Sequence, residues 1–464
     1  MTGETWRLGA SELSRAYRAG KTNPVEVVDQ LLSRIEKLNP GLNAYVALAP
    51  DLSAQAEESA SRLKRGAPLS PLDGVPIALK DNLVMRGLPA TWGSDVFTAV
   101  RETDELPVRR LRNAGALLVG KTNCPEFAVE GYTANRKFGV TGNPWNPQLT
   151  PGGSSGGAVA AVAAGLAAAA LGTDGGGSIR RPAGYTGLYG LKPTIGVIPR
   201  DGGLPQILLD FEVVGPLTRT AGDLRLIFDV LAGPDRQDPH SRTAGPSETA
   251  RDGLKVLYVE QFGDNPCDAE IRSSARAAAN LLSSLGHDVT AGPLPVDLEP
   301  INRFWGSFAQ IGLSHLLATI PEMAEKASPQ YLEMAALGAK VPAQDLYAAL
   351  EEVRRLRACV SQVFGEWDVI MTPSSAAHPW PAAKVFPDRI DGREVGPRGH
   401  AVYTGWVNAC GHPGVTVPAR PGAQGLPIGV QLIGDLHSED MLMSLAQAME
   451  KAGSGWRWPD YALG

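Results

Sequence analysis

The sequence predicts an α/β fold, in which helices cover both faces of a mixed, twisted β-sheet. Two observations favour this class. Short apolar segments, typical of buried strands, alternate with longer segments whose apolar residues recur at helical spacing. The two kinds of segment are spread along the whole chain rather than sorted into separate parts. Such alternation is typical of a sheet with helices on both sides.

The opening of the chain is predicted to be helical, with a helix that begins at Pro24. Asn23 is a favourable N-cap, Pro24 suits the first helical position, and Glu26 completes the start signal. An apolar stripe continues from there to Ile35. We expect residues 39–41, Asn-Pro-Gly, to end this helix.

The remaining elements follow in alternation. Strands are expected at 74–79, 116–120, 254–259, 368–371 and 428–433, and helices at 104–114 and 438–450. The most apolar run, 158–171, is rich in alanine and glycine and is too short to span a bilayer. It is predicted to be a tightly packed, buried helix.

The domain organisation is predicted to be simple. Residues 298–366 are helical in pattern nearly throughout, and we expect them to form a helical insertion or lid over the sheet. No long linker, repeat or low-complexity tract divides the sequence, apart from a polar stretch at 234–252. We therefore expect a single domain that spans residues 1–464.

Composition argues against several classes of function. The formal net charge of −6 gives no reason to expect a nucleic acid partner. The four cysteines are far apart and favour neither a disulfide framework nor a zinc site. The N-terminal residues 1–7 lack the features of a signal peptide. We expect a cytoplasmic protein with no nucleic acid and no membrane partner.

Three segments contain polar residues suited to catalysis, and the first is 72–82. Lys80 ends its otherwise apolar strand. A lysine at a strand end commonly extends its ammonium group to water. A buried lysine instead loses its charge more easily, and can then act as a base at neutral pH.

The second segment is the glycine-rich loop 151–157, which contains Ser154 and Ser155. A flexible turn or a phosphate loop at a helix N-terminus has a similar composition, and 152–156 also matches the GxSxG elbow of α/β-hydrolases. However, the proline-rich residues 143–151 cannot form the strand that such an elbow follows. The Gly-Lys-Ser/Thr of a nucleotide-binding loop does not occur in the sequence.

The third segment is 172–182, in which three glycines precede Ser178. Successive glycines place several backbone N–H groups around one point without obstruction by side chains. Such a group of donors is what the stabilisation of an oxyanion requires. A simple tight turn is the alternative, and this segment taken by itself does not decide between the two.

Taken together, the three segments resemble the amidase signature family. The resemblance extends from about residue 10 to residue 450, and it includes the segments 121–128, 143–146, 190–194 and 429–433. Its most specific part is the sequence GGSSGG followed by GGGSIR, whose serines Ser154 and Ser178 are 24 positions apart. The resemblance implies the amidase signature fold.

The resemblance also implies a catalytic triad. Ser178 is the expected nucleophile, Ser154, after a cis peptide bond, is the expected proton relay, and Lys80 is the expected base. The oxyanion hole is expected from the N–H groups of Gly175, Gly176 and Gly177, together with that of Ser178 itself. No metal and no organic cofactor is expected.

Three supporting residues are expected around the triad. Ser155 is expected to hydrogen-bond near Lys80 or Ser154, Asp174 to order the loop, and Arg180 to brace it. The sequence has Gly175 where many members have threonine. We interpret this as a tolerated variation that can affect the width of the substrate site.

The substrate is less well defined by the sequence. We expect the helical segment 298–366 to shape the pocket, together with aromatic side chains for which core packing is the alternative. These candidates are Tyr132, Phe304, Trp305, Trp380 and Trp406. As a group they favour an aryl or alkyl amide, anilide or carbamate (urethane). The expected partner is thus a small-molecule amide or carbamate substrate, and the expected state is a monomer or homodimer.

Two alternative functions remain open. The same motifs occur in the glutamine-hydrolysing A subunit of tRNA-dependent amidotransferases, which the chain also resembles. That protein has a charged section for glutamine at about 300–370 that is not evident in this sequence, so an amidase acting on simple amides is our main expectation. The other alternative is a binding protein that kept the fold and lost its activity.

Overall fold

The computed structural model describes residues 4–243, 251–453 and 455–464. Residues 1–3, which belong to the N-terminal segment discussed above, lie outside the described residues. So do residues 244–250 of the polar stretch.

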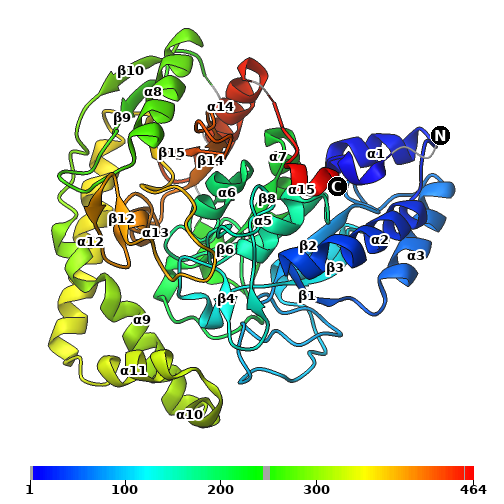
Figure 1. Cartoon of the computed structure of the whole chain (residues 1–464), viewed down its shortest axis with the longest axis horizontal. Helices are drawn as coiled ribbons and strands as arrows, with labels where there is room; N and C mark the ends of the chain where they lie inside the picture. The colour runs from blue at the N-terminus through cyan, green and yellow to red at the C-terminus, as the bar shows by residue number, and fades with distance from the viewer. Residues whose placement is uncertain (1–3, 244–250, 454) are drawn as a thin grey trace.

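A large mixed sheet forms the centre of the molecule (Figure 1). Its strands are β1 (Tyr45–Leu48), β2 (Pro76–Lys80), β3 (Leu117–Thr122), β6 (Ala169–Asp174), β7 (Tyr189–Lys192), β8 (Val213–Thr218), β9 (Lys255–Tyr258), β10 (Asp288–Ala291), β11 (Val369–Pro373), β14 (Gly414–Pro418) and β15 (Gly429–Gly434). Two short hairpins lie outside it, β4 (Ala134–Asn135) with β5 (Gly139–Val140), and β12 (Arg389–Ile390) with β13 (Arg393–Glu394).

The strand order of the large sheet is β1-β3-β2-β6-β8-β7-β14-β15-β11-β9-β10. Strand β2 runs parallel to its neighbours β3 and β6, and β9 runs parallel to its neighbours β10 and β11. The remaining pairs are antiparallel. The sheet is therefore mixed, as predicted.

Helices cover both faces of this sheet. They are α1 (Ala10–Arg18), α2 (Pro24–Leu42), α3 (Leu52–Lys64), α4 (Leu106–Asn113), α5 (Gly156–Ala163), α6 (Arg180–Thr186), α7 (Ala221–Leu231), α8 (Ala269–Ser284), α9 (Glu299–Thr319), α10 (Met323–Lys326), α11 (Pro329–Gly338), α12 (Ala343–Val363), α13 (Gly405–Cys410), α14 (Glu439–Ala452) and α15 (Asp460–Leu463). Helices α5 and α6 pack on each other and on the central strands, while α7 and α14 form a second pair that also packs on the sheet. The predicted fold class is confirmed.

Helix α2 extends beyond its predicted end. It starts as expected, with the Asn23 side chain accepting hydrogen bonds from the N–H groups of Val25 and Glu26. The helix then continues through Pro40. Its last turn is closed by Asn43, which has a left-handed conformation with φ of 51° and donates its N–H to the carbonyl of Asn39 at 2.7 Å. The prediction that residues 39–41 end the helix was therefore wrong by one to three residues.

The apolar run 158–171 is only half helical. Helix α5 ends at Ala163, the chain turns at Gly165 with φ of +68°, and residues from Ala169 onward form β6 in the middle of the sheet. The prediction of one buried helix was wrong for the second half. Alanine favours helix locally, but pairing with β2 and β8 on both sides outweighs that preference.

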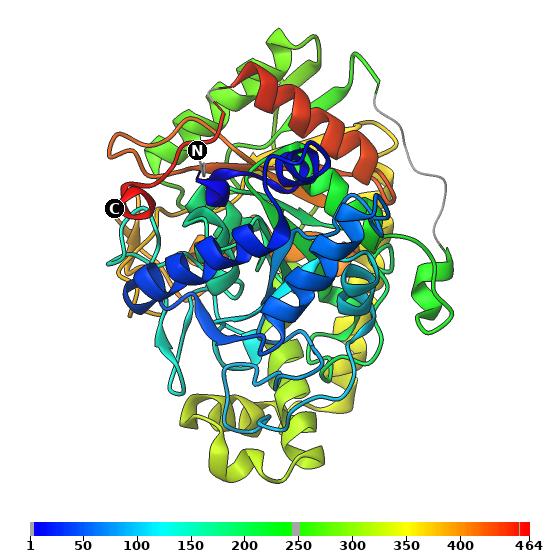
Figure 2. The ribbon, with the colours of Figure 1, turned by 90° about the vertical axis from the view of Figure 1, so that its right-hand side faces the viewer.

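The other predicted elements are present within two residues of their expected bounds. Residues 299–363 form the four helices α9 to α12. Figures 1 and 2 both show α9, α10 and α11 extending below the body of the molecule. Within the described part of the chain, no helix is both long and apolar enough to cross a membrane.

Candidate active site

The site lies where two neighbouring strands of the sheet end. Because β2 and β6 are adjacent and parallel, their carboxyl ends meet at the same edge of the sheet. Lys80 is the last residue of β2, and Thr173 and Asp174 are the last residues of β6. All three side chains are fully buried.

Lys80 binds hydroxyl groups rather than carboxylates. Its Nζ donates to Ser154 Oγ at 2.7 Å and to Thr173 Oγ1 at 2.8 Å. Desolvation lowers the pKa of Lys80 to about 8, and nearby groups such as Glu212 and Asp174 oppose this shift only in part. A lysine with this pKa can release its proton near neutral pH.

The loop with Ser154 and Ser155 runs beside the loop with Ser178. The peptide bond between Gly153 and Ser154 is cis, as expected. The N–H of Ser155 donates to the carbonyl of Ser178 at 3.3 Å, and Ser155 Oγ donates to the carbonyl of Thr173 at 3.2 Å. Ser155 thus acts on Thr173, which itself binds Lys80, rather than directly on Lys80 or Ser154.

Gly157 lets this loop approach the end of β3. A Cβ atom at this position would lie 2.4 Å from the backbone nitrogen of Asn123 and 2.7 Å from the carbonyl oxygen of Ala44. No real Cβ contact is that short, so only glycine fits here. The position of the two serines is therefore fixed by backbone that a larger residue would displace.

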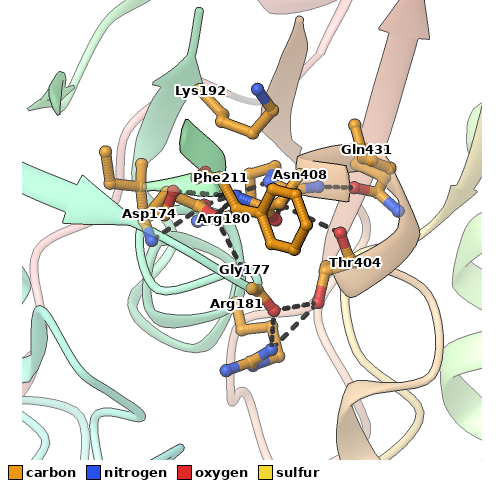
Figure 3. A network of polar contacts seen from close by, with 12 residues as sticks. Asp174, Gly177, Arg180, Arg181, Lys192, Phe211, Thr404, Asn408 and Gln431 are labelled. Atoms are coloured by element: carbon orange, nitrogen blue, oxygen red, sulfur yellow. Dashed lines mark hydrogen bonds and ion pairs between the residues drawn. The ribbon is translucent and has the colours of Figure 1, made fainter. Parts of the chain in front are cut away.

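Asp174 organises the turn that carries Ser178 (Figure 3). Its carboxylate accepts hydrogen bonds from the N–H groups of Gly177, Ile179 and Arg180, at 2.6, 3.0 and 3.2 Å. The buried Arg180 guanidinium pairs with it at 2.9 Å. Burial by itself would raise the pKa of Asp174, but the charge and hydrogen bonds of Arg180 and a bond from Asn408 hold it well below its ordinary value.

Arg180 also links this turn to the far side of the sheet. Its guanidinium donates to Gln431 Oε1 of β15 at 3.0 Å, to the carbonyl of Thr404 at 3.1 Å and to Asn408 Oδ1 at 2.5 Å (Figure 3). All three guanidinium nitrogens of Arg180 therefore donate hydrogen bonds.

The three glycines before Ser178 differ in what their N–H groups bind. The Gly177 N–H is already engaged by Asp174. Among the described residues, the N–H groups of Gly175, Gly176 and Ser178 meet no acceptor. The carbonyl of Gly176 accepts from Thr404 Oγ1 at 2.8 Å and from Arg181 Nη1. These bonds fix the peptide group between Gly176 and Gly177, whose N–H is the one that Asp174 accepts.

Ser178 opens onto a cavity of about 1310 Å³. Trp305 of α9 and Trp406 of α13 line this cavity, as expected. The other three aromatic candidates lie elsewhere. Tyr132 and Trp380 pack with Tyr185 in a small separate cluster, and Phe304 packs against the neighbouring core. Their apolar character reflects core packing, which sequence pattern does not distinguish from a pocket wall.

Several residues of the site were not identified from the sequence. Thr173 and Arg181 are adjacent to predicted site residues, and Gln431 lies within the motif at 429–433. Thr404 and Asn408 belong to no motif, and reach the Ser178 turn only through the folding of α13 against it. Within the described ranges, no cluster of three or more His, Cys, Asp or Glu side chains could hold a metal ion.

Comparisons with known proteins agree with this geometry. The model of the family described as Amidase matches residues 26–443. The A subunit of a glutamyl-tRNA(Gln) amidotransferase from Synechococcus sp. (strain CC9605) is 34% identical, over 97% of this chain and 96% of that protein. The relative from Symbiobacterium thermophilum, 32% identical over 96% of both chains, has the same name.

A solved structure gives the same fold. A bacterial aryl acylamidase of the amidase signature family superposes with a TM-score of 0.89 and 29% identity, over 98% of both chains. The agreement extends over the whole length of the two proteins.

One expectation from the sequence is overturned by these relatives. We expected a small-molecule amide or carbamate as the partner, no nucleic acid, and a monomer or homodimer. The relatives are named as one component of a multi-subunit enzyme that is itself named for a tRNA, so this prediction was wrong. Net charge was a poor guide, because it averages over the whole surface.

The fold, the arrangement of Lys80, Ser154 and Ser178, and the match over most of the sequence agree with each other. The chain belongs to the amidase signature family, enzymes that hydrolyse carbon–nitrogen bonds.

Proposed function

We propose that this enzyme hydrolyses the side-chain amide of glutamine, as the A subunit of a tRNA-dependent amidotransferase. The observation that carries this proposal is the set of relatives with that name, which are 31–34% identical over 92–98% of this chain. Coverage of this extent includes the cavity wall as well as the catalytic loops.

We assign the nucleophile to Ser178, the proton relay to Ser154 and the base to Lys80. Three observations support these roles. Lys80 Nζ and Ser154 Oγ are 2.7 Å apart, burial lowers the pKa of Lys80 to about 8, and Ser178 lines the cavity. The hydrogen bond from the N–H of Ser155 to the carbonyl of Ser178 holds the two serine loops together.

The reaction then has two stages, acylation of Ser178 and hydrolysis of the resulting ester. Neutral Lys80 accepts the hydroxyl proton of Ser154, and Ser154 takes the hydroxyl proton of Ser178. At the same time, Ser178 Oγ attacks the amide carbon. Ser154 next delivers a proton to the nitrogen, the C–N bond breaks, and ammonia leaves an ester on Ser178. Water repeats the same proton transfers, releases the acid and restores the three side chains.

We assign the oxyanion donors to Gly175, Gly176 and the N–H of Ser178. Their N–H groups are free among the described residues, and stabilisation of an oxyanion requires donors that are already oriented. The Gly177 N–H, which the sequence led us to include, is engaged by Asp174 at 2.6 Å. In this proposal Gly177 shapes the turn and does not bind the oxyanion.

The decisive experiment is release of ammonia or amine from glutamine, simple primary amides, anilides and carbamates. The chain is assayed by itself and after co-expression with the other amidotransferase subunits of its source organism. We expect glutamine to be hydrolysed, faster in the complex, and Ser178→Ala to lose at least about 10³-fold. Ser284→Ala, an exposed serine of α8, is the matched control. Lack of glutamine turnover in the complex would reject the proposal.

A second candidate is hydrolysis of an aryl amide or carbamate. The specific observation in its favour is the aromatic wall of the cavity, formed by Trp305, Trp406 and Phe262. The structural similarity to an aryl acylamidase supports it as well. Turnover of an anilide with none of glutamine in the same assays would select this candidate.

The domain and location expectations remain part of the proposal. A single domain over residues 1–464 is supported by the length of the family match. The cytoplasm as its location is supported by four free cysteines, which suit a reducing compartment.

A further inference from the structure

One side of the cavity that holds Ser178 contains three nitrogen-bearing side chains, those of Arg181, Arg398 and His400. None of them forms an ion pair with another of the described residues. Arg181 and His400 are buried, whereas Arg398 is exposed on the wall of the cavity. A buried cation such as Arg181 usually has an anionic partner, because the loss of water is otherwise uncompensated. The grouping of these side chains in a substrate cavity therefore indicates an anionic ligand.

Arg398 lies over one of the aromatic walls. Its guanidinium carbon is 4.9 Å from the ring centre of Trp305, and a Cβ atom at Gly405 would lie 3.0 Å from Arg398 Nη2. Desolvation by the surrounding protein, and then the charge of Arg181, lower the pKa of Arg398. The neighbouring charge that affects the pKa of Arg398 is therefore that of a second cation, Arg181.

Five acidic side chains also line the cavity. Glu212 pairs with Arg200 at 2.7 Å and Glu394 with Arg389 at 3.1 Å, while Glu130, Asp297 and Glu299 form no ion pair among the described residues. None of the five is paired with Arg398, and the charges that shift the pKa values of Arg398 and His400 are those of cations.

His400 is buried, with 3% of its surface exposed, and both of its ring nitrogens lack a hydrogen-bond partner among the described residues. A Cβ atom at Gly131 would lie 2.4 Å from His400 Nε2 and 3.7 Å from Arg181 Nη2, so the two side chains meet beside Gly131. Desolvation, followed by the charges of Arg181 and Arg398, lowers the pKa of His400. A neutral imidazole still has one N–H to donate.

This group adjoins the reaction centre through Gly176. Arg181 donates to the carbonyl of Gly176, and a Cβ atom at Gly176 would lie 3.2 Å from Trp305 Cζ2. The guanidinium of Arg398 lies over the Trp305 ring. Arg181, Arg398 and His400 therefore line the same cavity as Ser178, next to the turn that carries it.

We propose that Arg398 and His400, with Arg181 behind them, bind a carboxylate carried by the acyl part of the amide substrate. A guanidinium binds a carboxylate through two parallel N–H groups, and an imidazole N–H can donate to the same oxygens. This inference rests on the proposed amide hydrolysis at Ser178. If glutamine is the substrate, its α-carboxylate occupies this subsite. The subsite then takes the place of the charged section for glutamine that is not evident at 300–370.

The test uses two primary amides of the same length, glutaramate, which ends in a carboxylate, and pentanamide, which ends in a methyl group. We expect the wild type to have the higher kcat/KM for glutaramate. Arg398→Met should lower that value by about 10-fold or more, because a charge-assisted bond is lost, with a smaller change for pentanamide. Arg398→Lys should retain part of the preference, since its charge remains. Arg354→Met, an exposed arginine of α12, is the matched control.

Binding is measured separately with Ser178→Ala, as the rise in melting temperature caused by glutaramate and by pentanamide. A larger rise with glutaramate that disappears in Ser178→Ala/Arg398→Met supports the subsite even if no amide is hydrolysed, in which case only the proposed function fails. Equal effects of the two ligands, or a preference that survives Arg398→Met, would overturn the subsite while hydrolysis itself stands.

Discussion

Lys80 is a buried side chain whose described partners are hydroxyl and carbonyl groups. Its environment therefore favours the neutral form more than a carboxylate neighbour would. Thr173 is central to this environment, because its hydroxyl accepts from Lys80 and from Asn82 while its carbonyl accepts from Ser155.

The pKa of Lys80 leads to a prediction about pH. The base must be neutral, and a pKa lowered to about 8 leaves only about a tenth of it neutral at pH 7. We expect kcat/KM for an amide to rise with pH through about 8 and then to level off. A rate profile from pH 6 to 10 on the wild type measures this. A flat profile across that range would exclude Lys80 as the base.

The glycines of the Ser178 turn provide a matched pair of substitutions. Gly177 has φ of +110°, and a Cβ atom there would lie 2.2 Å from Thr404 Oγ1. A Cβ atom at Gly175 would lie 2.7 Å from the side-chain end of Leu208 and in ordinary contact with Glu212, at 3.5 Å. We expect Gly177→Ala to reduce kcat by about 100-fold or more, because the oxyanion donors move. Gly175→Ala should reduce it far less. Equal losses in kcat, measured with the same amide, would contradict this distinction.

At the residue level, the sequence predicted the positions that follow from a local motif and missed those that do not. Lys80, Ser154 and Ser178 each lie in a short, distinctive segment. Arg398 and His400 lie at a short 3₁₀ helix, residues 399–401, more than 200 residues after Ser178, and line the same cavity only in the folded chain. Nothing in their local sequence differs from that of a solvated loop.

At the level of elements, the turn between β6 and α6 depends on one buried ion pair. Arg180 and Asp174 are both fully buried, and their hydrogen bonds connect this turn with β15 and α13 (Figure 3). The Asp174 carboxylate accepts from the backbone N–H groups of Gly177, Ile179 and Arg180, which would otherwise be orphaned in the interior.

Removal of Arg180 should therefore destabilise the whole enzyme. We expect Arg180→Met to lower the free energy of unfolding by about 3–5 kcal/mol, because it leaves the Asp174 carboxylate buried and unpaired. Urea denaturation measures this change. Arg276→Met, which removes an exposed partner of Glu260, should leave the midpoint almost unchanged. Similar midpoints for both variants would show that the buried pair is not what holds the turn.

Element boundaries were predictable where local signals agree with the tertiary structure. The N-cap at Asn23 is one such case. The run 158–171 is the opposite case, because its alanines favour helix while the neighbours β2 and β8 require a strand. Pairing with strands distant in sequence decided that conflict, and a local pattern does not contain this information.

At the level of the whole molecule, the alternation of segments predicted the fold class but not the order of the strands. The central sheet brings β7 next to β14 and β11 next to β9, although more than 100 residues separate the members of each pair. Such neighbours follow from packing of the complete chain, and only the resemblance to a family carried that information.

Helix α9 should become less dynamic when a ligand occupies the cavity. Asn302, Trp305 and Ala309 of α9 line the cavity, and Met334 reaches it from α11. We expect hydrogen exchange of backbone amides in 302–309 to slow when glutamine binds to Ser178→Ala. Helix α3 serves as an internal control. No change in α9 at a saturating concentration would mean that this helix does not enclose the ligand.

Much of the cavity wall and the proposed catalytic residues come from different parts of the chain. Lys80, Ser154 and Ser178 are fixed by the sheet and by close backbone contacts, whereas Trp305, Arg398 and Trp406 all follow residue 298 and lie on α9, on the segment before α13 and on α13 itself. Mutations can accumulate in the second group without disturbing the first. A lineage with this layout can drift from one acyl group to another through intermediates that all remain folded and active.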